Sequence, residues 1–353
     1  MDLNIKHLMA DATRLTRGGD LNAATRAIQQ ALGGAPVPSA PSRPVGPRGT
    51  PPADDPSRVI EGHCTRLDEA TPTTGPERIL RSRHVDDRGA LDYRLFVPAR
   101  ALDAPAPPLL VMLHGCTQTA EDFATGTAMD ALARRNGCLV LYPDQSDRAN
   151  PQRCWNWFKH NHQRRGGGEA GLIERCVRQV VAEHAADPRR VFVAGLSAGG
   201  AMAAILGNVC PDLFAGVGVH SGLPAGAAGN LPEALKAMQQ GAPSGATRVG
   251  VVSPPTIVFH GDADRTVHPD NAERIVEACT ATGAPTRHRQ PAANGRRGWT
   301  RRVHRDVDTG VVAEHWCVHG AGHAWSGGDP RGSYTDAAGP DASAEMLRFF
   351  LSR

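Results

Sequence analysis

The sequence predicts an α/β fold in which a mostly parallel central sheet is flanked by helices, and three observations support this prediction. Apolar segments of strand length alternate with helical segments of about a dozen residues from residue 58 onward. Leu109–Leu113 is a continuous apolar run, which is typical of a central strand covered on both faces. The β-prone run Arg190–Ala194 leads directly into the G-x-S-x-G motif of Gly195–Gly199, and a small-residue helical segment follows it.

The first 57 residues differ in composition from the rest of the chain. Residues 1–34 are expected to form a small helical hairpin, because apolar residues recur at helical spacing on both sides of Gly18-Gly19. Residues 35–57 are rich in proline and poor in apolar side chains, which predicts a disordered linker. Residues 58–353 are expected to form one large domain. The hairpin is too short to be stable alone and is expected to dock on this domain or on a partner.

Within the large domain, strands and helices are expected in the following order. The expected strands are Leu91–Val97, Leu109–Leu113, Cys138–Tyr142, Arg190–Ala194, Gly216–His220, Thr256–His260 and Val311–Val318. The expected helices are Ala120–Asn136, Glu169–Ala185, Ala201–Leu206, Asn271–Ala281 and Asp341–Leu351, where apolar residues recur three or four positions apart. This alternation predicts βαβ units with right-handed crossovers.

Composition excludes several classes of function. The net charge is +3 and no block of basic residues stands out, so we expect no nucleic-acid binding. No apolar run approaches the roughly 18 residues of a membrane span. The N-terminal residues lack the pattern of a signal peptide, which predicts a cytoplasmic location. The eight cysteines are dispersed without a C-x-x-C pair, so most are expected to be small buried hydrophobic residues, with disulfides only if the protein is exported.

Ser197, at the centre of the G-x-S-x-G motif, is the candidate nucleophile. The alternative is an ordinary serine in a glycine-rich turn, since the chain holds 39 glycines. A serine hydroxyl needs a base within hydrogen-bond reach, and His323 follows the last expected strand in a loop of small residues. Asp264 is the preferred carboxylate to orient His323, with Asp262 as the alternative. The order Ser197, Asp264, His323 is that of α/β-hydrolases.

A serine nucleophile also needs backbone N–H groups to stabilise the oxyanion that forms on its substrate. The N–H of Ala198, directly after the nucleophile, is one expected donor. The second is expected from the loop after strand Leu109–Leu113, where His114-Gly115 resembles the oxyanion motif of esterases, and Cys116 is the preferred residue. Cys116 could itself be a nucleophile, but no base is suggested for it and a buried thiol is the favoured interpretation.

Five motifs together resemble the polyhydroxybutyrate depolymerase family of esterases, which also includes feruloyl and acetylxylan esterases. They are His114–Gln118, Cys154–Phe158, Gly195–Gly199, His260–Asp264 and Gly322–Gly328, and the resemblance covers roughly residues 80–353. It implies ester hydrolysis by Ser197, His323 and Asp264 without a cofactor. Many relatives are secreted, so an extracellular location is the alternative, although the chain lacks a visible signal peptide and adds the N-terminal hairpin. That hairpin could tether the enzyme to a polymer inclusion.

The aromatic residues near the motifs suggest how a substrate is held. Trp155, Trp157 and Phe158 cluster in the otherwise polar loop Pro143–Gly168, and Trp325 follows the candidate base. They are expected to form an exposed aromatic wall beside Ser197; the alternative is that the rings fasten a long loop to the domain. His160 and His162 have no third ligand, so no metal site is expected.

The preferred function is therefore hydrolysis of a polyester of the poly(3-hydroxybutyrate) type. Three alternatives remain open: a feruloyl or acetylxylan esterase, an α/β-hydrolase peptidase, and a non-catalytic binding module.

Overall fold

The computed structural model describes residues 74–101, 103–243, 254–280, 284–306 and 310–353. The hairpin predicted over residues 1–34 and the linker predicted over 35–57 lie outside the described residues, as does the predicted start of the large domain at residue 58.

One ten-stranded sheet organises the described residues, with strand order β10-β11-β12-β9-β8-β7-β5-β6-β3-β2. Its strands are β2 (Arg78–Asp86), β3 (Gly89–Val97), β5 (Leu109–Leu113), β6 (Leu139–Asp144), β7 (Val191–Leu196), β8 (Gly216–His220), β9 (Thr256–Gly261), β10 (Thr286–Gln290), β11 (Trp299–Asp306) and β12 (Gly310–Val318). The central strands from β12 to β6 pair in parallel, whereas β10-β11 and β3-β2 extend the two edges in antiparallel pairing. Two short pairs complete the strands: β1 (Thr74–Gly75) with β4 (Arg100–Ala101), and β13 (Trp325–Ser326) with β14 (Thr335–Asp336).

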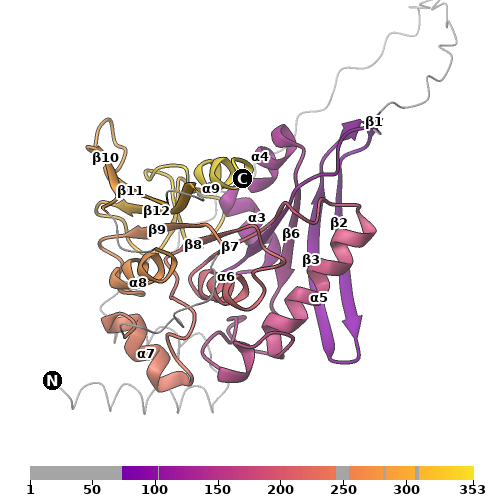
Figure 1. Cartoon of the computed structure of the whole chain (residues 1–353), viewed down its shortest axis with the longest axis horizontal. Coiled ribbons are helices and arrows are strands. Elements are labelled where there is room, and N and C mark those ends of the chain that lie inside the picture. The colour runs from indigo at the N-terminus through magenta and orange to yellow at the C-terminus, as the bar shows by residue number, and fades with distance from the viewer. Residues whose placement is uncertain (1–73, 102, 244–253, 281–283, 307–309) are drawn as a thin grey trace, which may run out of the picture. The chain divides into compact units, whose positions relative to one another are not determined.

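Helices cover both faces of the sheet (Figure 1). They are α3 (Ala120–Thr127), α4 (Met129–Asn136), α5 (Gly168–Glu183), α6 (Ala198–Val209), α7 (Leu231–Gln240), α8 (Asp270–Cys279) and α9 (Ala342–Leu351), with a 3₁₀ turn at His160–His162. Side chains of α5, α6, α7 and α8 pack in one hydrophobic cluster, and those of α3, α4 and α9 in a second. Successive residues of β5 alternate between the two clusters, as the period of two in a strand requires. Both faces of β5 are therefore buried, as its apolar sequence predicts.

All seven expected strands and the five expected helices are present, so the α/β prediction is confirmed. The helix expected over Ala120–Asn136 is two helices, because Ala128 adopts a left-handed conformation (φ 50°) and ends α3. The sequence patterns did not predict helix α7 or the strands β1, β2, β4, β10, β11, β13 and β14. β10 is exposed along its whole length. Its residues are all polar, so the sequence shows no alternation of apolar and polar side chains from which a strand could be predicted.

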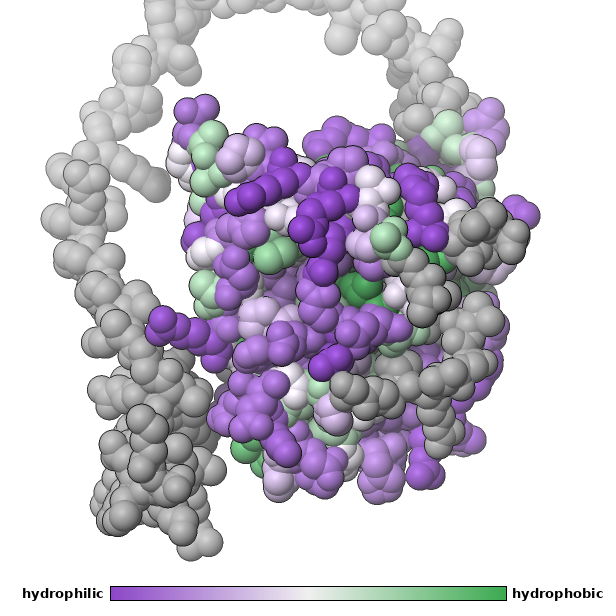
Figure 2. Space-filling model, turned by 60° about the vertical axis from the view of Figure 1, so that its left-hand side comes forward, coloured by the Kyte–Doolittle hydropathy of each residue, from purple (hydrophilic) through white to green (hydrophobic). Residues whose placement is uncertain are grey.

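The surface of the domain is mainly hydrophilic in the view of Figure 2, where hydrophobic residues occur in small, separate patches. No helix of the described residues has the length and apolar character needed to cross a membrane.

Candidate active site

Ser197 occupies a sharp turn between β7 and α6, with φ 56° and ψ −119°. This conformation is unfavourable for a residue with a side chain and is the one expected of a nucleophile elbow. The flanking positions must be glycine, because a Cβ on Gly195 would overlap the backbone of Gly199, and one on Gly199 would overlap the carbonyl of Leu113. The Ser197 N–H donates to the carbonyl of His220, 2.9 Å away, which fixes the turn against the end of β8.

His323 and Asp264 form a hydrogen-bonded pair: Nδ1 of His323 lies 2.7 Å from Oδ2 of Asp264. The other carboxylate oxygen, Oδ1, accepts the N–H groups of Thr266 and Val267, both at 2.9 Å. The Asp264 side chain is fully buried, whereas that of His323 is 12% exposed. Burial would raise the pKa of Asp264, but hydrogen bonds from His260 and His323 outweigh burial and hold this pKa well below its ordinary value. Asp264 is therefore ionised and orients His323, and no described residue bonds Nε2 of His323.

Asp262, the alternative carboxylate, lies elsewhere. Its Oδ1 accepts the N–H of Gly320 at 2.6 Å, and its Oδ2 lies 3.0 Å from Nδ1 of His319. The structure thus brings Asp264, not Asp262, to His323. Among the hydrogen bonds of the described residues, none joins the Ser197 hydroxyl to His323, so that step of the predicted triad stays a prediction.

His220, which no sequence pattern predicted as a site residue, links the elbow to the loop that carries His323. Its carbonyl accepts the Ser197 N–H, and its Nε2 accepts the N–H of Ser326 at 2.9 Å. Its ring stacks on that of Trp325, with 5.0 Å between centroids. Burial, with smaller contributions from His260 and His323, lowers the pKa of His220 to about 3. His220 is therefore a neutral structural link at neutral pH, and its sequence context, the end of an apolar strand, gives no sign of this role.

The loop after β5 lies against the nucleophile, as expected of an oxyanion loop. A Cβ built on Gly115 would lie 3.6 Å from Cβ of Ser197. In the described part of the chain, the backbone N–H groups of Cys116 and Ala198 have no hydrogen-bond acceptor. Ala198 is the first residue of α6, so its N–H also carries the positive end of the helix dipole. Both groups are available to an oxyanion; their catalytic role stays a prediction.

Gly115, whose carbonyl shares a peptide with the Cys116 N–H, is held at both its backbone polar groups. Nδ1 of His114 donates to the Gly115 carbonyl at 2.7 Å, and the Gly115 N–H donates to Oε1 of Gln118 at 2.9 Å. Nε2 of His114 accepts the N–H of Gln145, which identifies Nδ1 as the protonated nitrogen. Since the carbonyl and N–H of a trans peptide point in opposite directions, fixing the Gly115 carbonyl also fixes the Cys116 N–H.

Two cysteine predictions have different outcomes. Cys138, Cys176 and Cys210 are buried free cysteines, as expected. The interpretation of Cys116 as a buried thiol is wrong, because Cys116 forms a disulfide with Cys154. The two positions are brought together by the return of the loop after β6 to the loop after β5, a long-range approach that dispersed cysteines in the sequence do not disclose.

The prediction of an exposed aromatic wall is also wrong for the tryptophans. Trp155, Trp157 and Trp325 are 0%, 5% and 1% exposed, so they pack in the interior rather than present a binding surface. The indole N–H of Trp155 donates to the carbonyl of His114 at 3.1 Å, and that of Trp325 donates to Oγ of Ser343 at 3.0 Å. Trp155 and Trp157 thus fasten the loop after β6 to the domain, which is the alternative weighed for them.

Buried Glu169, at the start of α5, completes the attachment of this loop. Its carboxylate accepts the backbone N–H of Asn156 at 2.6 Å and the side-chain amide of Gln145 at 2.8 Å. Burial would raise the pKa of Glu169, but hydrogen bonds from His162, Asn156 and Gln145 lower it overall. The carboxylate is therefore charged at neutral pH and holds the segment that carries Cys154.

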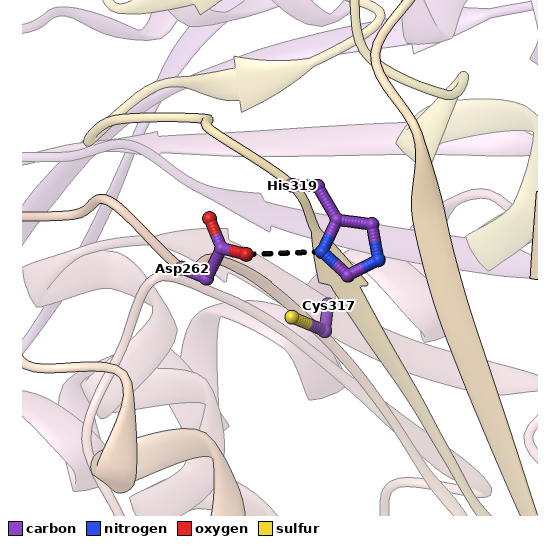
Figure 3. Close-up of side chains that lie close together, drawn as sticks. All are labelled: Asp262, Cys317 and His319. Carbon is purple, nitrogen blue, oxygen red and sulfur yellow. Dashed lines mark hydrogen bonds and ion pairs between the residues drawn. The ribbon is translucent and has the colours of Figure 1, made fainter. Parts of the chain in front are cut away.

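Within the part of the chain that the structure describes, one cluster of possible metal ligands includes Asp262, two residues before Asp264 in the sequence. Figure 3 shows Asp262, Cys317 and His319, whose ligand atoms lie within 4.8 Å of one another. Both ring nitrogens of His319 already make hydrogen bonds, Nδ1 to Asp262 at 3.0 Å and Nε2 to Oγ1 of Thr300 at 2.9 Å. A cation would have to replace the bond between His319 and Asp262, so we assign no metal to this cluster.

The doubly covered parallel sheet, the serine elbow and the buried histidine–aspartate pair define the α/β-hydrolase class. Residues 91–282 match the family model described as Esterase PHB depolymerase, and the chain belongs to this family.

Curated relatives support the assignment. The chain is 32% identical over 227 residues to poly(3-hydroxyalkanoate) depolymerase C of Paucimonas lemoignei, which covers 61% of this chain and 54% of the relative. It is 29% identical over 208 residues to probable acetylxylan esterase A of Aspergillus fumigatus, with 52% of each protein covered. The chain thus spans about half the length of these relatives. A solved acetyl xylan esterase from Aspergillus awamori superimposes with a TM-score of 0.62 at 18% identity, covering 78% of this chain and 100% of that one, which supports the fold.

Proposed function

We propose that this protein hydrolyses carboxylic esters through a covalent intermediate on Ser197, and that its substrate is a polyester or oligoester of the poly(3-hydroxybutyrate) type. The observation that carries the proposal is the buried, ionised Asp264 bonded to Nδ1 of His323. Ser197 has the backbone conformation of an elbow, and His220 links it to the loop that carries His323. The nature of the substrate rests on the relatives alone, since the first of them is a poly(3-hydroxyalkanoate) depolymerase.

In the proposed mechanism, Oγ of Ser197 attacks the ester carbonyl while Nε2 of His323 takes the hydroxyl proton. Asp264 stabilises the imidazolium that forms. The N–H groups of Cys116 and Ala198 stabilise the oxyanion, a contribution of roughly 10²–10³-fold in rate for each donor. The tetrahedral intermediate expels the alcohol, which receives the proton from His323. Water, deprotonated by His323, then attacks the acyl-enzyme and releases the acid.

Hydrolysis of p-nitrophenyl acetate by the full chain, the Ser197→Ala variant and a Ser352→Ala control tests the proposed chemistry. Ser352 lies at the C-terminal end of α9, where its hydroxyl bonds a backbone carbonyl. We expect activity in the full chain and the control, and none above background in Ser197→Ala. Equal activity in all three proteins would reject the proposal and favour a non-catalytic module.

A substrate panel then separates the esterase types. It contains 3-hydroxybutyrate oligomers, a poly(3-hydroxybutyrate) film, an acetylated xylan, a feruloyl ester and an aminoacyl p-nitroanilide. The proposal predicts the highest kcat/KM on the hydroxybutyrate oligomers. A higher value on acetylated xylan or the feruloyl ester would reassign the substrate while leaving the ester chemistry intact, and a higher value on the anilide would favour a peptidase.

We further propose that the protein acts outside the cytoplasm, the alternative to the predicted cytoplasmic location. The Cys116–Cys154 disulfide supports this, since disulfides persist in oxidising compartments. Fractionation of the cells that make the protein, with thiol counting on the recovered chain, tests it. A cytoplasmic pool with both cysteines free would contradict it.

A further inference from the structure

Tyr334 is an exposed aromatic side chain beside the candidate active site. Five large hydrophobic side chains of the described residues are exposed: Ile79, Val85, Leu231, Leu235 and Tyr334. The first four lie on β2 and α7, elements that carry none of the candidate site residues. Tyr334, 43% exposed, lies in the loop between β13 and β14, just after the segment that carries His323.

Two hydrogen bonds place Tyr334 between the oxyanion loop and the His323 loop. Its hydroxyl lies 3.2 Å from Oγ1 of Thr117, the residue after Cys116. Since the single Thr117 hydroxyl proton is donated to the Cys116 carbonyl at 2.6 Å, Tyr334 is the donor of the bond to Thr117. At the backbone, the Tyr334 carbonyl accepts the N–H of Trp325 at 2.6 Å, two residues after His323.

Both partners in the first bond have an unusual backbone. Tyr334 has φ 51° and Thr117 has φ 67°, values that bulky and β-branched residues rarely adopt. Such conformations persist only where the surroundings impose them, and they concentrate at ligand sites. Here the N–H of Ser333 donates to Oδ1 of Asp122 at 2.9 Å, and the side-chain amide of Gln118 donates to the Ser333 carbonyl at 3.1 Å. The Tyr334 loop is therefore clamped to the oxyanion loop.

We infer that the ring of Tyr334 forms one side of a subsite that binds the apolar group adjoining the scissile ester, a methyl, methylene or aryl group. The inference rests on the proposed esterase function and adds a residue that determines specificity. The Tyr334 hydroxyl is committed to Thr117, so the side chain presents its ring rather than a polar group to the substrate. An exposed ring held in a fixed orientation buries apolar substrate surface at little entropic cost. Tyr334 thus fills the role that the buried tryptophans cannot.

Two substrate ratios test the subsite. The ratio of kcat/KM for p-nitrophenyl butyrate to that for p-nitrophenyl acetate reports binding of the acyl chain. The ratio for p-nitrophenyl acetate to ethyl acetate reports binding of the alcohol. Tyr334→Ala removes the ring, Tyr334→Phe keeps it, and Ile79→Ala is a matched control that truncates an exposed apolar residue on β2. A thermal unfolding scan of each variant verifies folding, and Tyr334→Asn replaces the alanine variant if that fails to fold, because asparagine tolerates positive φ.

We expect Tyr334→Ala to lower one of the two ratios by roughly tenfold. One methylene group enclosed in a hydrophobic pocket changes kcat/KM by roughly 10–200-fold, and the low end applies here because the ring covers only one side of the subsite. The change should fall mainly on KM. Tyr334→Phe and Ile79→Ala should keep both ratios within about twofold of the unaltered protein. Unchanged ratios in Tyr334→Ala, an equal loss on every ester, or a loss as large in Tyr334→Phe would overturn the subsite while leaving the esterase function standing. A complete absence of ester hydrolysis by the unaltered protein would overturn both.

Discussion

Removal of the Cys116–Cys154 crosslink should weaken both the fold and the reaction. The two cysteines are 38 residues apart in sequence. In the chain-entropy model, opening a loop of this length costs about 4 kcal/mol of unfolding free energy at 25 °C. Replacing both cysteines by alanine keeps the backbone N–H of residue 116 and leaves no unpaired thiol. The unfolding free energy of the double variant should therefore be lower by about 4 kcal/mol.

The expected effect on turnover is smaller than the loss of a whole oxyanion donor. His114 and Gln118 still hold the Gly115 peptide after the crosslink is removed. We therefore expect kcat for p-nitrophenyl acetate to fall by about tenfold, against roughly 10²–10³-fold for a lost donor.

Urea unfolding followed by tryptophan fluorescence measures the first effect, with the slope m checked for constancy. Cys317→Ser serves as the control, since Cys317 is a partly buried free cysteine. An unfolding free energy within about 1 kcal/mol of the unaltered protein, with kcat unchanged, would refute both the crosslink and its support of the oxyanion loop.

Three further predictions concern the carboxylates, pH and the elbow. Asp264→Asn should lower kcat by about 10³–10⁴-fold, whereas Asp262→Asn should stay within about threefold, as measured by ester hydrolysis; the reverse order would exchange their roles. Burial lowers the pKa of His220 and His315 from 6.5 to about 3, so the unfolded chain binds more protons between these values. The unfolding free energy should therefore fall as pH drops from about 6.5 toward 3, and His220→Gln should flatten the curve in urea titrations; an unchanged slope would contradict this. Gly199→Ala should cost at least about 3 kcal/mol because its Cβ overlaps the Leu113 carbonyl, against about 1 kcal/mol for Gly137→Ala, where the added Cβ meets no atom; equal losses would contradict the close approach.

The sheet could be predicted from sequence because its central strands are buried on both faces. Continuous apolar runs such as Leu109–Leu113 are rarely exposed to solvent, which favours a buried strand, and this run is β5 in the structure. The edge strands β2 and β10 face solvent, so charged residues interrupt the apolar pattern from which a strand is predicted. Chain order also pointed to Asp264 and His323, since loops at the ends of parallel strands meet at one edge of the sheet.

Other features of the site depend on contacts between residues far apart in the sequence, which no local sequence pattern predicts. Trp155 and Trp157 lie in a polar segment, so their side chains were predicted to be exposed. The segment is instead bound to buried Glu169 through Asn156 and Gln145. His220 looks like the last residue of a buried strand, and only its bonds to Ser197 and Ser326 give it a place in the site. The role of Tyr334 could not be predicted, because Tyr334 and Thr117 lie on two loops more than 200 residues apart in the sequence and meet only in the fold.

The mass of the protein during turnover shows whether Ser197 carries the acyl group. The chain is mixed with p-nitrophenyl acetate, quenched in acid within the first turnover and digested for mass spectrometry. We expect an acetyl group on Ser197, formed with a burst of p-nitrophenol of about one equivalent and absent from Ser197→Ala. Hydrolysis without this adduct, or an acetyl group on another residue such as His323, would show that Ser197 is not the nucleophile.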